Sequence, residues 1–465
     1  MTSNFIVDMK LKTFHRIILF YFLAFFAVMT FTCVRYYYDE LSIYDSAYAL
    51  SFFGYGGLLI FLISYLKKDV EIKKNTSYIL LLGFFLLTGL SVAFAVDRFT
   101  AVYGNKGRYE GFLSIIGYTG LFLAASVLYV EKYKKVILDI FVGFGFFQAV
   151  LGILQSIPAL DKYIPSYFSA FRFNTEAFIA NGITGSPVFL SALLTMLCAV
   201  SLSGAIYDGS KARRILYAFV TTVSVICAFL TDVIQAIIGI SAAFITIGII
   251  EIVRIKKGHT LLKGKILSNS LGRFSLLLLS GAIVTAVMIP LGEAKLQDKS
   301  VIFEDSFYRA YVTGDQDAFD DGNIYLHMMG EGIEILKDKP FFGTGPDCIT
   351  RELYTTSDET DEQSFLMLPN GSIDRPYNEY LYIAMSRGIP CLLVYLALLF
   401  FTLKKGFSRV GGFYKRTDSW TGAAFTAAVT AYLVQAFLGM SAVTVTPFFW
   451  IMLGFILSKK ESEGS

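Results

Sequence analysis

Charged residues are scarce in this sequence. Only 17% of the 465 residues are charged, while 55% are hydrophobic, and the mean hydropathy is +0.59. Ordinary soluble domains carry about 25% charged residues. The composition therefore excludes a soluble globular protein.

Histidine and cysteine are also rare. Of three histidines, only His327 falls in the long polar segment discussed below, which excludes a multi-histidine metal site there. Four of the five cysteines lie in or beside apolar runs, where cysteine acts as a small hydrophobe, and Cys348 stands alone in the polar segment. No disulfide framework is indicated, and we expect neither a metal nor a cofactor.

Long apolar runs make up most of the sequence. A membrane-spanning helix needs about 20 mostly apolar residues, and we predict spans at 17–34, 48–66, 78–95, 112–130, 136–157, 185–203, 215–231, 233–253, 274–291, 379–403, 421–439 and 445–458. The first run lacks a small-residue cleavage site, which favours a retained helix over a signal peptide. We therefore predict an all-α polytopic membrane protein with about 12 transmembrane helices.

One polar segment interrupts these runs. Residues 292–378, which we call the acidic segment, hold 18 acidic and 7 basic residues, although the whole chain has a net charge of +3. The segment lies between the ninth and tenth predicted helices. We therefore predict three parts, namely helices 1–9 in 1–291, the acidic loop in 292–378, and helices 10–12 in 379–465.

The basic residues predict the orientation. With twelve crossings both termini lie on one side, and that side holds 26 of the 40 lysines and arginines. An excess of basic residues marks the cytoplasmic side of a membrane protein. Both termini are therefore predicted in the cytoplasm, and the acidic segment on the outer face.

Five arginines are predicted at the outer ends of helices: Arg98, Arg108, Arg172, Arg375 and Arg387. Guanidinium groups bind phosphate and pyrophosphate through paired hydrogen bonds. Arginines at such positions also reach outward to lipid headgroups. For a single arginine the second interpretation is favoured, whereas for the set of five an anionic ligand is equally favoured.

Several motifs occur in a fixed order along the chain. Gly107-Arg-Tyr-Glu-Gly111 follows the third predicted helix, and Gly185-Ser-Pro187 opens the sixth. The acidic segment contains Lys337-Asp-Lys-Pro-Phe-Phe-Gly-Thr-Gly-Pro-Asp347, followed by Asp374-Arg-Pro-Tyr-Asn-Glu-Tyr-Leu381 and Gly388-Ile-Pro390. Together these motifs resemble the O-antigen ligase and O-antigen polymerase superfamily of bacterial envelope proteins.

This resemblance implies a GT-C-like helical bundle in the bacterial cytoplasmic (inner) membrane. It also implies a membrane glycosyltransferase that moves a glycan from undecaprenyl diphosphate to an envelope acceptor on the outer face, without nucleotide or metal. Its expected partners are the lipid-linked donor, the acceptor and the bilayer, and no nucleic acid. The implied substrate-binding residues are Arg108, Arg172, Arg375, Arg387, Asn378 and Asp347.

The sequence departs from the family pattern at the catalytic base. Tyr377 stands where the family has a histidine thought to activate the acceptor hydroxyl. Tyrosine is a poor base near neutral pH because its reference pKa is about 10. His327, Glu379 or Asp347 can replace the missing base, so the catalytic candidates are Tyr377, His327 and Glu379. Asn323 and Ile234 stand where the family often has arginine.

Three interpretations follow. The chain is a working ligase or polymerase with a shifted site, a catalytically degenerate paralogue that binds lipid-linked glycan or assists a homologous partner protein, or a transporter. The transporter is the least favoured, because transport sites usually place ionisable residues in the middle of spanning helices. Only Asp139, Gln148, Gln155 and Gln435 come near such positions.

Overall fold

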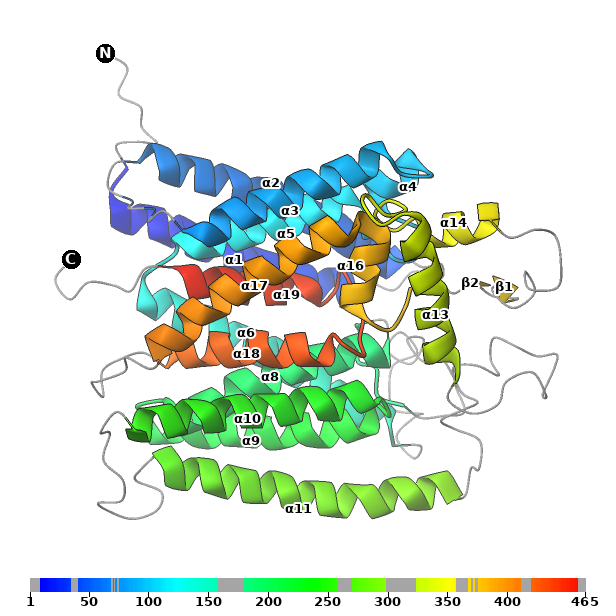
Figure 1. The fold of residues 1–465 in the computed structure, drawn as a ribbon. Helices are drawn as coiled ribbons and strands as arrows, with labels where there is room; N and C mark the ends of the chain where they lie inside the picture. Colours follow the sequence, from blue (N-terminus) through cyan, green and yellow to red (C-terminus); the bar gives the residue numbers. More distant parts are fainter. Residues whose placement is uncertain are drawn as a thin grey trace.

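The structure is a computed structural model that describes residues 9–34, 41–67, 70, 72, 75–157, 179–184, 186–256, 270–297, 323–356, 367–368, 371–372, 375–410 and 420–458. These residues form helices packed side by side (Figure 1). One antiparallel pair of two-residue strands, β1 (Met367–Leu368) and β2 (Gly371–Ser372), is the exception. The fold is therefore all-α in architecture.

The helices follow the predicted runs closely. Their bounds are α1 Leu11–Val34, α2 Leu41–Leu66, α3 Thr76–Ala93, α4 Arg98–Tyr103, α5 Phe112–Val127, α6 Glu131–Gln155, α8 Pro187–Tyr207, α9 Lys211–Leu230, α10 Ile234–Lys256, α11 Ser270–Gln297, α13 Asn323–Asp338, α14 Ile349–Thr356, α16 Glu379–Arg387, α17 Ile389–Val410, α18 Thr421–Gln435 and α19 Thr446–Leu457. Several helices begin at a residue whose side chain favours a helix N-terminus. Asn75 caps α3 and Asp97 caps α4 through side-chain hydrogen bonds to backbone N–H groups, and Ser186-Pro187 opens α8.

Each predicted span contains a helix. Within the described residues, nine helices are long and apolar enough to cross a membrane by length and composition, and α5 and α19 are shorter apolar helices. The predicted span 379–403 is two helices, α16 and α17, because Gly388 adopts a φ of +88° between them. The chain is thus a polytopic membrane protein, as the sequence predicted.

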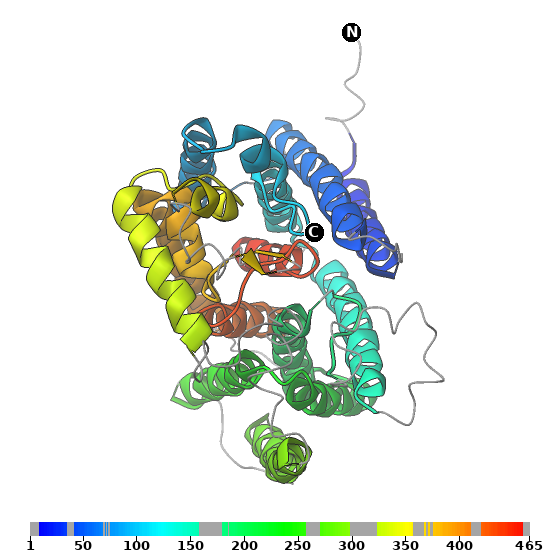
Figure 2. The same ribbon diagram turned by 90° about the vertical axis from the view of Figure 1, so that its right-hand side faces the viewer.

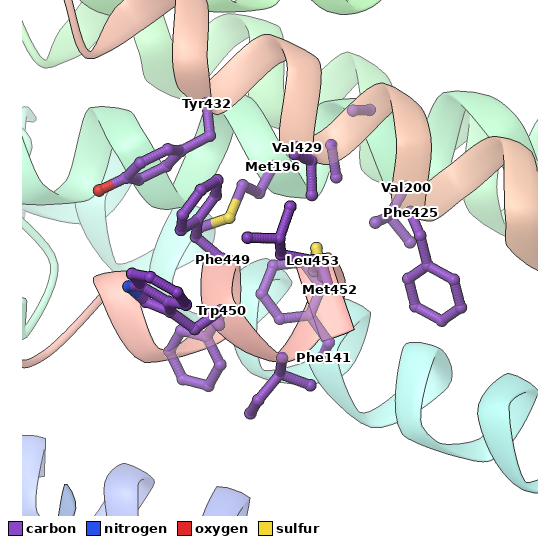
Figure 3. Packing of buried hydrophobic residues seen from close by; sticks show 14 of the residues in the cluster. Phe141, Met196, Val200, Phe425, Val429, Tyr432, Phe449, Trp450, Met452 and Leu453 are labelled. Atoms are coloured by element: carbon purple, nitrogen blue, oxygen red, sulfur yellow. The ribbon is translucent and has the colours of Figure 1, made fainter. Parts of the chain in front are cut away.

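The last helix, α19, lies at the centre of the bundle. Figure 2 looks along the helices and shows α19 enclosed by the others, with α11 at the periphery. Every residue from Thr446 to Leu457 is buried. Figure 3 shows Phe449, Trp450 and Leu453 of α19 packed beside side chains of α18, α8 and α6.

Two helices meet backbone to backbone. A Cβ atom added at Gly120 of α5 would lie 1.9 Å from the carbonyl oxygen of Gly54 in α2. Small residues allow such an approach, and they are common where helices pack in membranes. The pair α2–α5 therefore depends on the absence of side chains at this contact.

The two ends of the bundle carry different residues and different helices. The start of α1 and the end of α19 lie at one end, together with the basic residues Lys67, Lys405 and Arg409, which donate to backbone carbonyls there. The helices α13, α14 and α16 lie at the opposite end (Figure 1). Residues 298–322 of the acidic segment lie outside the described residues, and α11 continues past the predicted boundary at residue 291.

Candidate functional site

The FFGTGPD turn, residues 341–347, is attached to the C-terminal end of α16. The backbone N–H groups of Thr344 and Gly345 donate to the carbonyls of Met385 and Ser386, each at 2.9 Å. Gly343 has a φ of +65°, and a Cβ atom there would lie 2.4 Å from the Met385 oxygen. Only glycine fits this approach. The attachment holds the last residue of the turn, Asp347, within hydrogen-bond distance of the Tyr382 hydroxyl of α16.

Arg375 lies at the centre of this region, in what we call the Arg375 cluster: Arg375, Glu110 and Asp347. Its Nη1 atom donates to Glu110 Oε2 and its Nη2 atom donates to Asp347 Oδ1. Nη1 also donates to the Ser441 carbonyl at 3.2 Å. The side chain is 1% exposed. Because burial of an unpaired charge is costly, two carboxylates on one guanidinium make this burial possible.

Glu110 is a second buried carboxylate that the sequence interpretation did not single out. It accepts hydrogen bonds from the hydroxyls of Tyr118 at 2.5 Å and Ser441 at 2.6 Å. Burial by itself raises the pKa of Glu110, but the Arg375 charge and these hydrogen bonds outweigh it, so the pKa lies below its usual value. Glu110 is therefore ionised and neutralises Arg375.

Asp347 accepts from four donors at once. Its Oδ2 atom accepts from the backbone N–H groups of Asn105 at 2.8 Å and Glu110 at 3.0 Å. Its Oδ1 atom accepts from Arg375 and from the Tyr382 hydroxyl at 3.2 Å. The acidic segment and the loop before α5 are joined through this one carboxylate.

A small pocket opens beside the cluster. Its wall is made of residues from four parts of the chain: Gly107, Arg108, Phe189, Arg375, Ser441, Ala442, Val443 and Thr444. Arg108 lies over the Phe189 ring, with 5.6 Å from its Cζ atom to the ring centroid. Two of the predicted phosphate-binding arginines, Arg108 and Arg375, thus share one pocket.

Arg387 lies near this pocket but does not line it. Its guanidinium is buried between the rings of Phe84 and Tyr382, with 5.7 Å and 5.8 Å to their centroids. Arg375 lies 4.5 Å from the same Tyr382 ring. Within the described residues, Arg387 forms no ion pair. Tyr382 therefore contacts both guanidinium groups.

Glu379 begins α16 and is also buried. It accepts from the hydroxyls of Tyr432 at 2.9 Å and Tyr395 at 3.2 Å. Burial raises the pKa of Glu379 to about 7, although both hydrogen bonds act in the opposite direction. The carboxyl group can therefore change its protonation state near neutral pH.

The remaining predicted site residues are placed as follows. Asn378 caps α16, because its side-chain oxygen accepts from the Leu381 N–H at 3.0 Å. Tyr377 is 8% exposed and belongs to the hydrophobic core of the bundle. His327 lies in α13, but its side chain is outside the described part of the chain, as is the whole of Arg172. Arg98 is exposed on α4.

No group of three His, Cys, Asp or Glu side chains that could hold a metal ion is found in the described ranges. The ionisable groups of the site contact one another instead. Arg375 links Glu110 and Asp347, and Tyr382 links Arg375 with Arg387. The arrangement is suited to binding an anion and to holding a proton at neutral pH.

Comparison with known families identifies one domain. Residues 190–396, which are 207 of the 465 residues, match the O-antigen ligase family. This match supports membership of the chain in the O-antigen ligase superfamily. The O-antigen ligase domain extends from the first turns of α8 into α17, and it includes Asp347, Arg375 and Glu379 but not Arg108 or Glu110. No curated protein matches the chain at a significant level.

An O-antigen ligase domain supports a membrane role in polysaccharide assembly through glycosyl transfer. It also supports interaction with the lipid bilayer and with lipid-linked glycan. The matched range includes the acidic segment entirely.

Proposed function

We propose that the chain transfers a glycan from undecaprenyl diphosphate to an envelope acceptor on the outer face of the bacterial cytoplasmic membrane. The observation that carries this proposal is the pocket shared by Arg108 and Arg375 at the end of the bundle that holds the acidic segment. A diphosphate is a suitable ligand for two guanidinium groups in one pocket.

In the proposed reaction, the acceptor hydroxyl attacks the first sugar carbon of the donor. The bond from that carbon to the diphosphate oxygen breaks, and undecaprenyl diphosphate leaves with its charge stabilised by the arginines. The hydroxyl proton passes to a base of the protein. The reaction balances without any oxidant, nucleotide or metal.

Glu379 is our candidate for this base. Its pKa of about 7 lies near the working pH, which is the best value for a general base. Hydrogen bonds position Glu379 relative to the pocket wall but are no path for the proton, because they end at a backbone amide, so the acceptor hydroxyl has to reach the Glu379 carboxylate itself. The Tyr432 hydroxyl that donates to Glu379 lies 3.2 Å from Thr446 Oγ1. Thr446 Oγ1 in turn accepts from the N–H of the pocket residue Ala442 at 2.9 Å.

The test is the release of undecaprenyl diphosphate by purified protein in lipid vesicles that contain glycan-loaded donor and an acceptor. We expect release from the unaltered protein, and at least about a hundredfold slower release from Glu379→Gln, because general bases contribute about 10²–10⁴ in rate. Lys337→Gln is the matched control, since Lys337 forms an exposed ion pair with Glu334 away from the pocket. Absence of release, with an active homologue as positive control, rejects the proposal.

A second candidate function is a non-catalytic protein that binds lipid-linked glycan or assists a homologous partner. One observation favours it: Tyr377, which replaces the family histidine, is packed in the hydrophobic core and not in the pocket wall. If this function holds, the unaltered protein releases nothing alone, while Tyr377→His or addition of a homologue produces release. Turnover by the unaltered protein alone excludes it.

A further inference from the structure

Asp347 occupies a position that is built to hold an anion. Four donors converge on its carboxylate, two from the backbone of Asn105 and Glu110 and two from the side chains of Arg375 and Tyr382. Backbone N–H groups that point to one spot, supplemented by arginine, are the usual donors for phosphate oxygens. The ligand present in the structure is a carboxylate of the protein itself.

We propose that Asp347 is a displaceable internal anion, and that a phosphate group of the donor takes its place on these four donors. This inference rests on the proposed function, since it specifies how the donor diphosphate reaches Arg375. It makes the backbone N–H groups of Asn105 and Glu110 and the Tyr382 hydroxyl ligands of the phosphate, together with Arg375. The sequence pattern had identified none of these three groups as a ligand.

The location of the pocket supports this displacement. Arg375 lines the pocket and also binds Asp347, so a ligand that enters the pocket lies next to the same buried guanidinium. Arg108 lines the pocket as well and adds a second positive charge near the entering anion. Glu110 remains in place on its own hydrogen bonds to Tyr118 and Ser441 and keeps Arg375 oriented.

The backbone at Asp347 favours its release. Asp347 has a φ of +60°, in the left-handed region that residues with a side chain seldom adopt. The next residue, Cys348, is fully buried, and its thiol donates to the Asp97 carbonyl at 3.3 Å. When Asp347 leaves its donors, the end of the turn moves with it, and the Cys348 thiol becomes accessible.

Accessibility of Cys348 provides the first test, on the full chain without any change at residue 347. Purified protein in vesicles is treated with a maleimide, alone or with inorganic phosphate, inorganic pyrophosphate or undecaprenyl diphosphate. We expect the anions to accelerate labelling about tenfold or more, since the burial of Cys348 also raises the pKa of its thiol to about 12 and slows its reaction. Cys348→Ser measures the labelling of the other cysteines.

The arms of this test distinguish the source of the phosphate. Acceleration by inorganic pyrophosphate shows that the phosphate group is sufficient, whereas acceleration by undecaprenyl diphosphate alone shows that the lipid is required. Both results support displacement. Unchanged labelling with all three ligands overturns it.

Substitution provides the second test. Asp347→Asn and Asp347→Ala remove the competing charge, so inorganic pyrophosphate should bind about tenfold more tightly, because the binding-competent state no longer has to be released. Asp97→Asn, a neighbouring carboxylate that caps α4, should leave the affinity unchanged. Equal or weaker binding by a folded Asp347 variant overturns the inference.

Glycan release is measured on the same preparations. Release of glycan without any change in Cys348 labelling overturns the displacement but leaves the proposed function intact. Faster labelling without release overturns the proposed function and leaves the displacement intact. The two failures are therefore distinguishable.

Discussion

Arg375 is stabilised by carboxylates from two distant parts of the chain. Glu110 precedes it by 265 positions and Asp347 by 28. Removal of one member of a buried ion pair leaves an uncompensated charge, which costs about 3–5 kcal/mol. The cluster therefore joins the acidic segment to the bundle as well as forming the pocket wall.

Arg375→Gln should therefore destabilise the protein by about 3–5 kcal/mol, because it leaves two carboxylates buried without a cation. Thermal unfolding in detergent measures this loss. The exposed pair Lys337–Glu334 provides the control, since Lys337→Gln should cost at most about 1 kcal/mol. Equal losses in the two variants would contradict the role of Arg375.

Glu379 should make stability depend on pH. The pKa of Glu379 is raised to about 7 in the folded protein from its ordinary value of 4.5, so between these values the folded state holds a proton that the unfolded state has released. Stability from this group is therefore fully present below about pH 4.5 and is lost as the pH rises through 7, by about 3 kcal/mol at most.

Unfolding measured between pH 5 and 8 checks this expectation. Glu379→Gln should remove the decline in stability over this range, because the amide does not titrate. A decline of the same size in Glu379→Gln would assign it to another group.

At the scale of helices, the contact between α2 and α5 depends on Gly120. Gly120→Ala should lower the thermal midpoint by several degrees, because the new Cβ atom would lie 1.9 Å from the Gly54 oxygen. Gly143 in α6 is the matched control, since a Cβ atom there meets nothing within 4 Å. Gly143→Ala should leave stability unchanged or raise it by about 0.5–1 kcal/mol. Equal effects would show that the contact is not tight.

The helices could be predicted from sequence because apolar runs and caps are local signals. The break within the apolar run 379–403 was also recognisable, because Gly388 and Pro390 are local signals for a short helix followed by a spanning one, and the structure has α16 and α17 there. Asn378 also carried a local signal, because asparagine is a preferred helix cap. Its hydrogen bond to Leu381 shows a structural role for the side chain.

The site itself could be predicted only in part. The arginines were recognisable by type and position, and Arg108 and Arg375 do share a pocket. Their partners were not recognisable, because no periodic pattern indicates which loops of a bundle meet. The pairing of Glu110 with Arg375 is a consequence of the packing of α5, α16 and the turn before α19.

At the scale of the whole molecule, the two ends of the bundle carry different charge. We propose that the end with Lys405 and Arg409 faces the cytoplasm and that α14 faces outward, following the excess of basic residues at the first end. Cysteine substitution tests this orientation in intact cells. Arg351→Cys should react with a membrane-impermeant maleimide and Lys211→Cys should not.

The unaltered protein is the background control for this labelling, because it contains five cysteines. The exposed side chains of Arg351 and Lys211 make both substitutions mild. If only Lys211→Cys is labelled, the orientation is the reverse of the one proposed, and the Arg375 cluster lies on the cytoplasmic side.

The central place of α19 has a consequence for biosynthesis. A chain is made from its N-terminus, so α19 leaves the ribosome after the described helices that surround it. Those helices cannot reach their final packing before α19 is inserted among them. A chain that stops before residue 446 would therefore lack the side chains that fill the centre of the bundle.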